Sequence, residues 1–461
     1  MGDSRLQASA DNVTPLAFRI SERVAVQSID ALDASVVAKV KTCLFDLIGC
    51  ASESLEKPWS QQARAMAAPA VSTPGESASI IGSAQRSSLA DAAFVNAVMG
   101  HGLVREDMHS ASISHLGVAV LPAVLALSQH RRVSGKDFLA AVVAGYEVGA
   151  AMGRAIMDPQ LARLFRPTGI TGPIGAAAAG ARLLGLSTQQ TANAIALATN
   201  TVAGLNQWGH TGGSEMYFHV GFAARNAVSA VLLAEAGAFG SPTALDGEAG
   251  LFASHGKRAA AQSVQVFEGQ PEIMSVYHKP VPACNFAQTA CQAAMALART
   301  GRCDPERIAA ITIRVPSAGA NYPGCDFRGP YEHVLQAKMS IQYNVVAALM
   351  TAGVTEANFD LLQDPRLHRL LDKTRLEVDE AMTRAYPAQQ GGAVEIQMTD
   401  GSLHQERLVD VVNATPTEVR ARYRVAVADV MGTDAATRIE ALIDGLLLSQ
   451  DAGELAAALS A

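Results

Sequence analysis

The feature that most constrains this chain is a succession of alanine-rich apolar segments between residues 37 and 237, each bounded by residues typical of helix ends. Three segments open at capping-box spacing: Ser88 with Asp91, Ser134 with Asp137, and Ser187 with Gln190. A further segment, residues 221–237, stops at Gly237, a residue type that favours helix termination. Apolar residues lie on more than one face, as in helices buried inside a bundle. The pattern predicts one large all-helical domain.

The pattern changes near Ser275. A helix is expected over residues 285–300, a strand over 308–315, and two strands within 394–409 around the Asp-Gly pair at 400–401, which favours a tight hairpin. Single hydrophobic cores stop growing at roughly 250 to 300 residues, so a chain of 461 residues should form two domains. The terminal stretch 429–459 is helical again and should dock on the larger domain.

The predicted fold class is therefore mainly α. Residues 15–272 with 412–461 form the all-helical domain, and residues 273–411 form a smaller α+β lid domain.

Composition limits the partners. A net charge of -7 without a basic stripe argues against nucleic acid, because phosphate binding needs clustered Lys and Arg. No apolar run reaches the roughly 18 residues of a membrane span, and residues 1–12 lack a secretion signal. The six cysteines show neither CxxC pairs nor metal-type spacing and are expected to be reduced thiols. We expect a cytoplasmic protein with no membrane partner.

The densest polar stretch is residues 101–115, HGLVREDMHSASISH, with three histidines beside Glu106 and Asp107. A solvated loop is the plain interpretation. Alternatively, histidine and carboxylate together supply a general acid and base. A zinc site of His109 and His115 with a carboxylate ranks last, because the spacing is not a recognised ligand motif.

Two further stretches carry chemistry-bearing residues. Residues 206–226 place Glu215, His219 and Arg225 around glycines too irregular for a phosphate loop, yet a helix amino terminus there would suit a carboxylate. Without a ligand it is a connecting loop with Arg225 in a surface ion pair. Residues 278–285, HKPVPACN, hold Lys279, ordinarily a surface residue but a base or a cation when desolvated in a cleft. Cys284 is expected to pack in the core.

Several blocks occur in an order that resembles the MmgE/PrpD family over nearly the whole chain. They are CLFDLIGCA, ADAAFVNAVMGHGL, HLGVAVLPAVLAL, GYEV, RPTGITGPIGAA, HVGFAARN and KPVPACN. This family includes 2-methylcitrate dehydratase, cis-aconitate decarboxylase and iminodisuccinate epimerase. The resemblance implies an all-helical domain with an α+β lid, a homodimer, and an interdomain active site without metal or organic cofactor. There, acids and bases move a proton next to a carboxylate.

The resemblance also implies site residues. The catalytic candidates are His115, Lys279, Tyr343 and Asp107. The substrate-binding candidates are Glu106, Arg166, Glu215, His219 and Gln288.

Four positions depart from the family pattern. Arg166 stands where relatives have a histidine, Met216 replaces a lysine, Gln288 replaces a histidine and Val104 replaces an aspartate. Arg166 has no usable proton-transfer pKa but can clamp a carboxylate. The expected substrate is therefore a small carboxylate-bearing acid rather than the known family substrates.

The leading hypothesis is a cofactor-independent lyase, most simply a dehydratase, with Lys279 or His115 as the base, the other as the acid, and Tyr343 assisting protonation. The runner-up is an epimerase or isomerase that uses the same carbanion. A non-catalytic binding protein on the enzyme fold is the third hypothesis.

Overall fold

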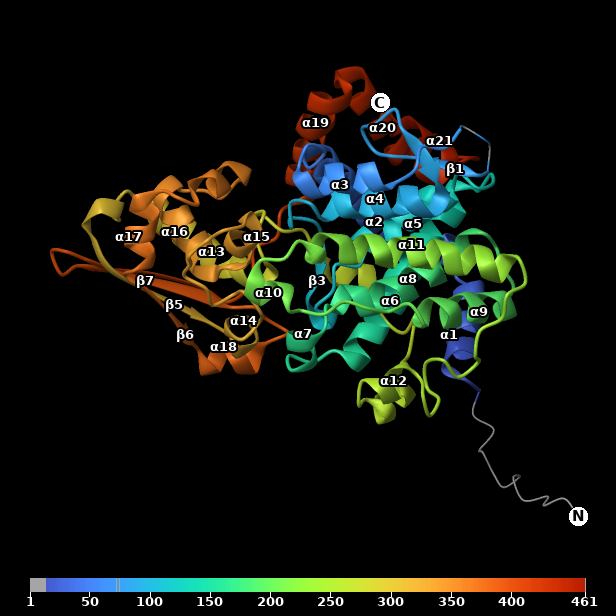
Figure 1. The fold of residues 1–461 in the computed structure, drawn as a ribbon, viewed down its shortest axis with the longest axis horizontal. Coiled ribbons are helices and arrows are strands. Elements are labelled where there is room, and N and C mark those ends of the chain that lie inside the picture. Colours follow the sequence, from blue (N-terminus) through green and yellow to red (C-terminus); the bar gives the residue numbers. More distant parts are fainter. Residues whose placement is uncertain (1–13, 72, 74, 461) are drawn as a thin grey trace, which may run out of the picture.

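The computed structural model describes residues 14–71, 73 and 75–460, so the expectation about a secretion signal lies outside it. Figure 1 shows a larger helical domain and a smaller lobe in which helices flank a sheet. The fold class is confirmed: the molecule is mainly helical, with few strands in small sheets and a smaller α/β region.

The helical domain follows the predicted order. Its helices are α1 (Leu16–Ala25), α2 (Ala34–Glu53), α3 (Pro58–Met66), α4 (Leu89–His101), α5 (Gly117–Leu127), α6 (Gly135–Ile156), α7 (Leu161–Leu164), α8 (Pro167–Leu183), α9 (Thr188–Thr199), α10 (Trp208–Thr211), α11 (Glu215–Glu235) and α12 (Leu251–Ser254). Its short antiparallel strand pairs are β1 (Ser77–Ser79) with β2 (Arg86–Ser88), and β3 (Met108–His109) with β4 (Val276–Tyr277).

The predicted helix caps are present. The side chains of Ser88, Ser134 and Ser187 accept hydrogen bonds from the backbone N–H three residues later, opening α4, α6 and α9. Helix α11 ends at Glu235, and Gly237 follows with a positive φ of 95°. These signals lie within the local sequence, which is why sequence alone located them.

Small residues bring α6 and α8 together at the centre of this domain. A Cβ added at Gly175 would lie 2.6 Å from the carbonyl oxygen of Gly145, so the backbones approach too closely for a side chain. By length and composition α6 could cross a membrane, yet 89% of its apolar window is buried inside the protein, as in a core helix.

The smaller lobe contains one four-stranded mixed sheet of order β6-β5-β7-β8. Its strands are β5 (Ile308–Val315), β6 (Thr374–Val378), β7 (Gly392–Met398) and β8 (Leu403–Leu408). Its helices are α13 (Gln288–Arg299), α14 (Ser317–Ala320), α15 (Val334–Met339), α16 (Ile341–Thr351), α17 (Pro365–Leu371) and α18 (Glu380–Ala385). The hairpin from β7 to β8 turns at Gly401, which has a positive φ of 87°, as the Asp-Gly pair predicts.

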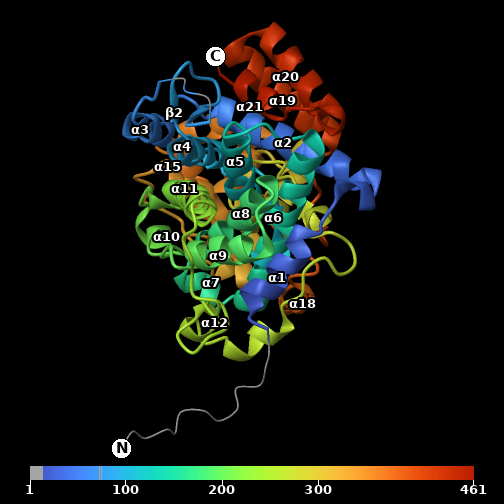
Figure 2. The ribbon, with the colours of Figure 1, turned by 90° about the vertical axis from the view of Figure 1, so that its right-hand side faces the viewer.

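The chain returns to the helical domain at its end. Helices α19 (Pro416–Met431), α20 (Thr433–Gly445) and α21 (Gly453–Ala458) follow β8, and α19 packs against α2. Figure 2 shows these three helices beside α2 and α5, so the predicted docking occurs. Helix α19 begins earlier than expected, because a capping box of Thr415 and Glu418 opens it.

Candidate active site

The polar stretch 101–115 is buried rather than solvated. It runs from the end of α4 through β3 to the start of α5, and β4 from the domain junction pairs with β3. Val104 and Ile113 both adopt positive φ, 57° and 54°. Branched residues rarely take this conformation, and such strain persists where surrounding contacts enforce it, often at functional sites.

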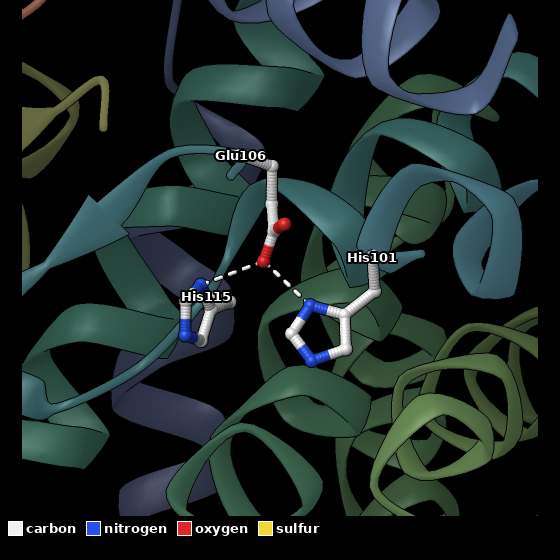
Figure 3. Close-up of side chains that lie close together, drawn as sticks. All are labelled: His101, Glu106 and His115. Atoms are coloured by element: carbon white, nitrogen blue, oxygen red, sulfur yellow. Dashed lines mark hydrogen bonds and ion pairs between the residues drawn. The ribbon is translucent and has the colours of Figure 1, made fainter. Parts of the chain in front are cut away.

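Glu106 lies between two histidines (Figure 3). Its Oε1 is 2.5 Å from Nδ1 of His101 and 2.8 Å from Nδ1 of His115. Both imidazoles turn Nδ1 toward the carboxylate and Nε2 away from it. All three side chains are at most 4% exposed. The resemblance gave Glu106 a substrate-binding role, whereas its contacts are those of a group that orients histidines.

Hydrogen bonds identify the tautomers of both histidines. Nδ1 of His115 lies 3.2 Å from the carbonyl oxygen of Asp107, which can only accept, so Nδ1 carries the proton. Nε2 of His101 receives a hydrogen bond of 3.0 Å from Arg166, so the proton of His101 is also on Nδ1. Within the described residues no hydrogen bond engages Nε2 of His115. Its lone pair is free to take a proton.

Burial keeps both histidines neutral. Desolvation lowers the pKa of His115 well below its ordinary value, with the nearby Lys279 cation adding to the effect and Glu106 opposing it. Desolvation also lowers the pKa of His101. The pKa of Glu106 lies well below its usual range: burial alone would raise it, but the two histidines stabilise its charged form. A carboxylate beside neutral imidazoles is thus present at neutral pH.

A narrow cavity of about 20 Å³ adjoins this cluster, and His115 and Arg166 both line it. Arg166 is buried and donates a 3.2 Å hydrogen bond to the hydroxyl of Tyr322, which also lines the cavity. A second donor, the amide of Asn206, lies 3.4 Å from the same hydroxyl. No acceptor for the Tyr322 proton is found in the described part of the chain, so that proton can point into the cavity.

Two lysines from the second half of the chain hold the loop of residues 102–107. Nζ of Lys279 donates to the carbonyl of Val104 at 2.8 Å, and Nζ of Lys338 donates to the carbonyl of Leu103 at 3.1 Å. Both lysines are fully buried, and desolvation lowers the pKa of each, to about 8 for Lys338. Lys279 does not line the cavity. Its position fits holding the loop and offsetting the charge of Glu106 better than acting as a base.

Asp107 turns away from the cavity. Its carboxylate accepts a 2.5 Å hydrogen bond from the hydroxyl of Tyr146, and burial raises its pKa. Gly117 permits this contact, because an added Cβ would lie within 2.5 Å of Asp107 Oδ1 and closer still to the tyrosine hydroxyl. Asp107 therefore acts on His115 through its main-chain carbonyl.

Three predicted site residues are not brought to the cavity. The Tyr343 hydroxyl donates to the carbonyl of Asn358 at 2.6 Å, so the expected role in protonation is wrong. The amide of Gln288 binds the backbone of residues 281–284 and shapes the loop instead of meeting a substrate. Glu215 is exposed at the first turn of α11.

His219 lies near Arg166 without lining the cavity. Burial lowers its pKa to about 4, and the Arg166 cation adds to the effect. Its Nδ1 is buried and has no hydrogen-bond partner in the described residues. Direct substrate contact by His219 stays a prediction.

The suggested zinc pair of His109 and His115 does not assemble. His109 binds Ser112 and Glu272 at 2.8 and 3.0 Å. Ligand-type atoms of His101, Glu106 and His115 do lie within 4.8 Å of one another and could hold a metal ion. However, both histidines present protonated Nδ1 atoms to one oxygen, and the nearby Arg166 and Lys279 cations oppose a further positive charge. The geometry favours a hydrogen-bonded acid–base cluster.

Sequence reasoning missed His101 and Tyr322 as site residues. His101 was visible within the polar stretch, but as the last residue of α4 it resembled a helix end. Tyr322 stands in the connection after α14, about 150 residues from Arg166, and no local pattern links the two.

Comparisons with known proteins cover both parts of the chain. The MmgE/PrpD N-terminal domain model matches residues 19–263, and the MmgE/PrpD C-terminal domain model matches residues 281–446. The chain belongs to the MmgE/PrpD family. The second match includes α19 and α20, which pack on the helical domain, so the sequence halves and the structural domains do not coincide.

Similar proteins are known as cis-aconitate decarboxylases and 2-methylcitrate dehydratases. The cis-aconitate decarboxylase-like protein oryM of Aspergillus oryzae is 29% identical, over 93% of this chain and 94% of its own. The cis-aconitate decarboxylase of Aspergillus terreus is 25% identical over 90% of each chain. The 2-methylcitrate dehydratase of Cupriavidus necator is 27% identical over 80% of each chain.

Proposed function

We propose that this MmgE/PrpD protein is a lyase that removes a proton from the carbon next to a carboxylate of a small organic acid, using its own side chains. The dehydratase and decarboxylase names of its relatives support the lyase class. The observation that carries the proposal is the free Nε2 of His115, at a cavity that Arg166 also lines. A neutral imidazole and a fixed cation are what this step needs.

His115 is the proposed base. When Nε2 takes the proton, the ring becomes an imidazolium, and Glu106 at 2.8 Å from Nδ1 stabilises that charge. Glu106 thus orients the base and favours its charged product, as the carboxylate does in a catalytic triad.

Arg166 and Tyr322 are the proposed carboxylate-binding and acid groups. The guanidinium would hold the substrate carboxylate and stabilise negative charge as the carbanion forms. In dehydration the C–O bond breaks, its electron pair leaves with oxygen, and a proton converts the hydroxyl into water. The Tyr322 hydroxyl can supply that proton: burial raises its pKa and keeps it protonated, and Arg166 beside its oxygen stabilises the phenolate that remains.

An epimerase would use the same carbanion and is the alternative outcome of the test. A panel of 3-hydroxy acids bearing one to three carboxylates is incubated with the protein in deuterated water and followed by NMR and mass spectrometry. The proposal expects new alkene signals with loss of water. Exchange of one carbon-bound hydrogen for deuterium without loss of water would replace the lyase with an epimerase. No change in any acid would favour a binding protein. Homodimer formation and a cytoplasmic location stay predictions.

A further inference from the structure

The cavity beside His115 is mostly apolar. Of the described side chains that line it, Arg166 is the one permanent cation. Tyr322 and Asn285 add polar atoms. The remaining wall is largely hydrophobic, made of Val104, Met108, Ile113, Met216, Phe286 and Met339.

The charged side chains of the lining leave one positive charge to be paired. Arg166 is buried there, and no Asp or Glu of the described residues lines the cavity. Burial lowers the pKa of His115, the other basic group of the lining, so it adds no charge at neutral pH. A ligand with a single carboxylate neutralises Arg166, whereas each additional carboxylate is buried without a matching cation, which is costly.

Arg166 retains capacity for a ligand. Its two terminal nitrogens contact Tyr322 and His101, and its Nε is buried without a partner in the described residues. Arg166 is only 5% exposed, so solvent does not readily supply that partner. An unsatisfied buried donor beside a cavity is a favourable place for a ligand oxygen.

Met216 closes the wall next to this cation. Its Sδ lies 3.7 Å from the guanidinium of Arg166 and 2.8 Å from Nε2 of His101. A fully buried thioether at this point offers dispersion contacts and no hydrogen-bond donor. The part of the substrate that meets it should be apolar.

We infer that this site takes a small acid with one carboxylate and an apolar arm, and that it discriminates against tricarboxylates. Arg166 binds the carboxylate, Tyr322 keeps its proton for the leaving group, and Met216 and its apolar neighbours contact the arm. The cavity is narrow, about 20 Å³, so the side chains around it must move apart to admit the acid. This inference rests on the proposed function, since it assumes that the cavity is the substrate site.

A matched series of unsaturated acids tests it. Each of the three acids has a carboxylate attached to an alkene carbon. Tiglate has one carboxylate in total, mesaconate has two and trans-aconitate has three. Isothermal titration calorimetry at constant pH and ionic strength should give a Kd for tiglate at least tenfold lower than that for trans-aconitate. Arg166→Gln should weaken tiglate binding at least tenfold.

Met216→Lys adds a cation, so it should reduce the ratio of the Kd for trans-aconitate to the Kd for tiglate at least tenfold. The control Met216→Leu should leave this ratio unchanged. The wild-type series decides the inference even if Met216→Lys folds poorly. Equal or tighter binding of trans-aconitate by the wild type overturns the single-carboxylate inference and leaves the lyase proposal standing. The converse result is that the wild type binds tiglate more tightly than trans-aconitate while His115→Gln turns over substrate at the wild-type rate. That result overturns the catalytic proposal and leaves the binding preference standing.

Discussion

Gly117→Ala should both destabilise the helical domain and disturb the proposed base. The new Cβ would lie within 2.5 Å of Asp107 Oδ1 and even closer to the hydroxyl of Tyr146, so the carboxylate or the ring must move. The hydrogen bond from the Tyr146 hydroxyl to the Asp107 carboxylate is 2.5 Å long. The main-chain carbonyl of Asp107 also accepts a hydrogen bond from Nδ1 of His115. Overpacking costs about 1–3 kcal/mol. Weakening a hydrogen bond to an ionisable group adds roughly 1–2 kcal/mol.

Alanine offsets part of this loss, because it has a better helix propensity than glycine by up to about 1 kcal/mol. The cost of the clash exceeds this gain, so the free energy of unfolding should fall by about 2–3 kcal/mol. The value of kcat should fall as well. The matched control is Gly445→Ala at the end of α20, where an added Cβ meets nothing within 4 Å. Chemical denaturation and steady-state kinetics measure both effects. If Gly117→Ala were as stable and as active as Gly445→Ala, this packing argument would be refuted.

Three further predictions concern the ionisable groups. Glu106→Gln should lower kcat on the order of 10²–10⁴-fold. Because Glu106 raises the pKa of His115, the substitution should also move the acid limb of the pH–rate profile to lower pH. An unchanged acid limb would show that Glu106 does not tune the base. Tyr322→Phe should lower kcat on the order of 10²-fold with a smaller rise in KM, and wild-type turnover would show that its proton is not used. Burial depresses the pKa of His109 to about 4 from 6.5, so the unfolded chain binds a proton that the folded one rejects. The contribution of His109 to the free energy of unfolding should therefore be complete above pH 6.5 and should fall by about 2 kcal/mol by pH 5. In urea titrations, His109→Gln should reduce the dependence of the free energy of unfolding on pH in this range.

The sequence predicted the helices and the hairpin because their signals are local. Serine caps, Gly237 and the Asp-Gly turn act within a few residues, and each occurs where expected. Strand β6 escaped prediction because it is mostly polar and pairs in parallel with β5, a non-local contact.

The site was less predictable, because hydrogen bonds between distant segments decide which group faces the cavity. His115 and Arg166 line it, as family motifs suggested they would. Tyr343 carries the same hydroxyl as Tyr322, but its proton is bound to a carbonyl within its own lobe. Lys279 matches a family motif, yet two carbonyl oxygens surround its ammonium group.

The central claim is that Nε2 of His115 removes a proton next to a carboxylate. The most direct measurement is deuterium incorporation or elimination at that carbon, followed by NMR in deuterated water with the 3-hydroxy acid on which the wild type is most active. The account predicts that His115→Gln abolishes both processes while the variant still binds the acid with a similar Kd. Undiminished proton removal by folded His115→Gln would contradict it.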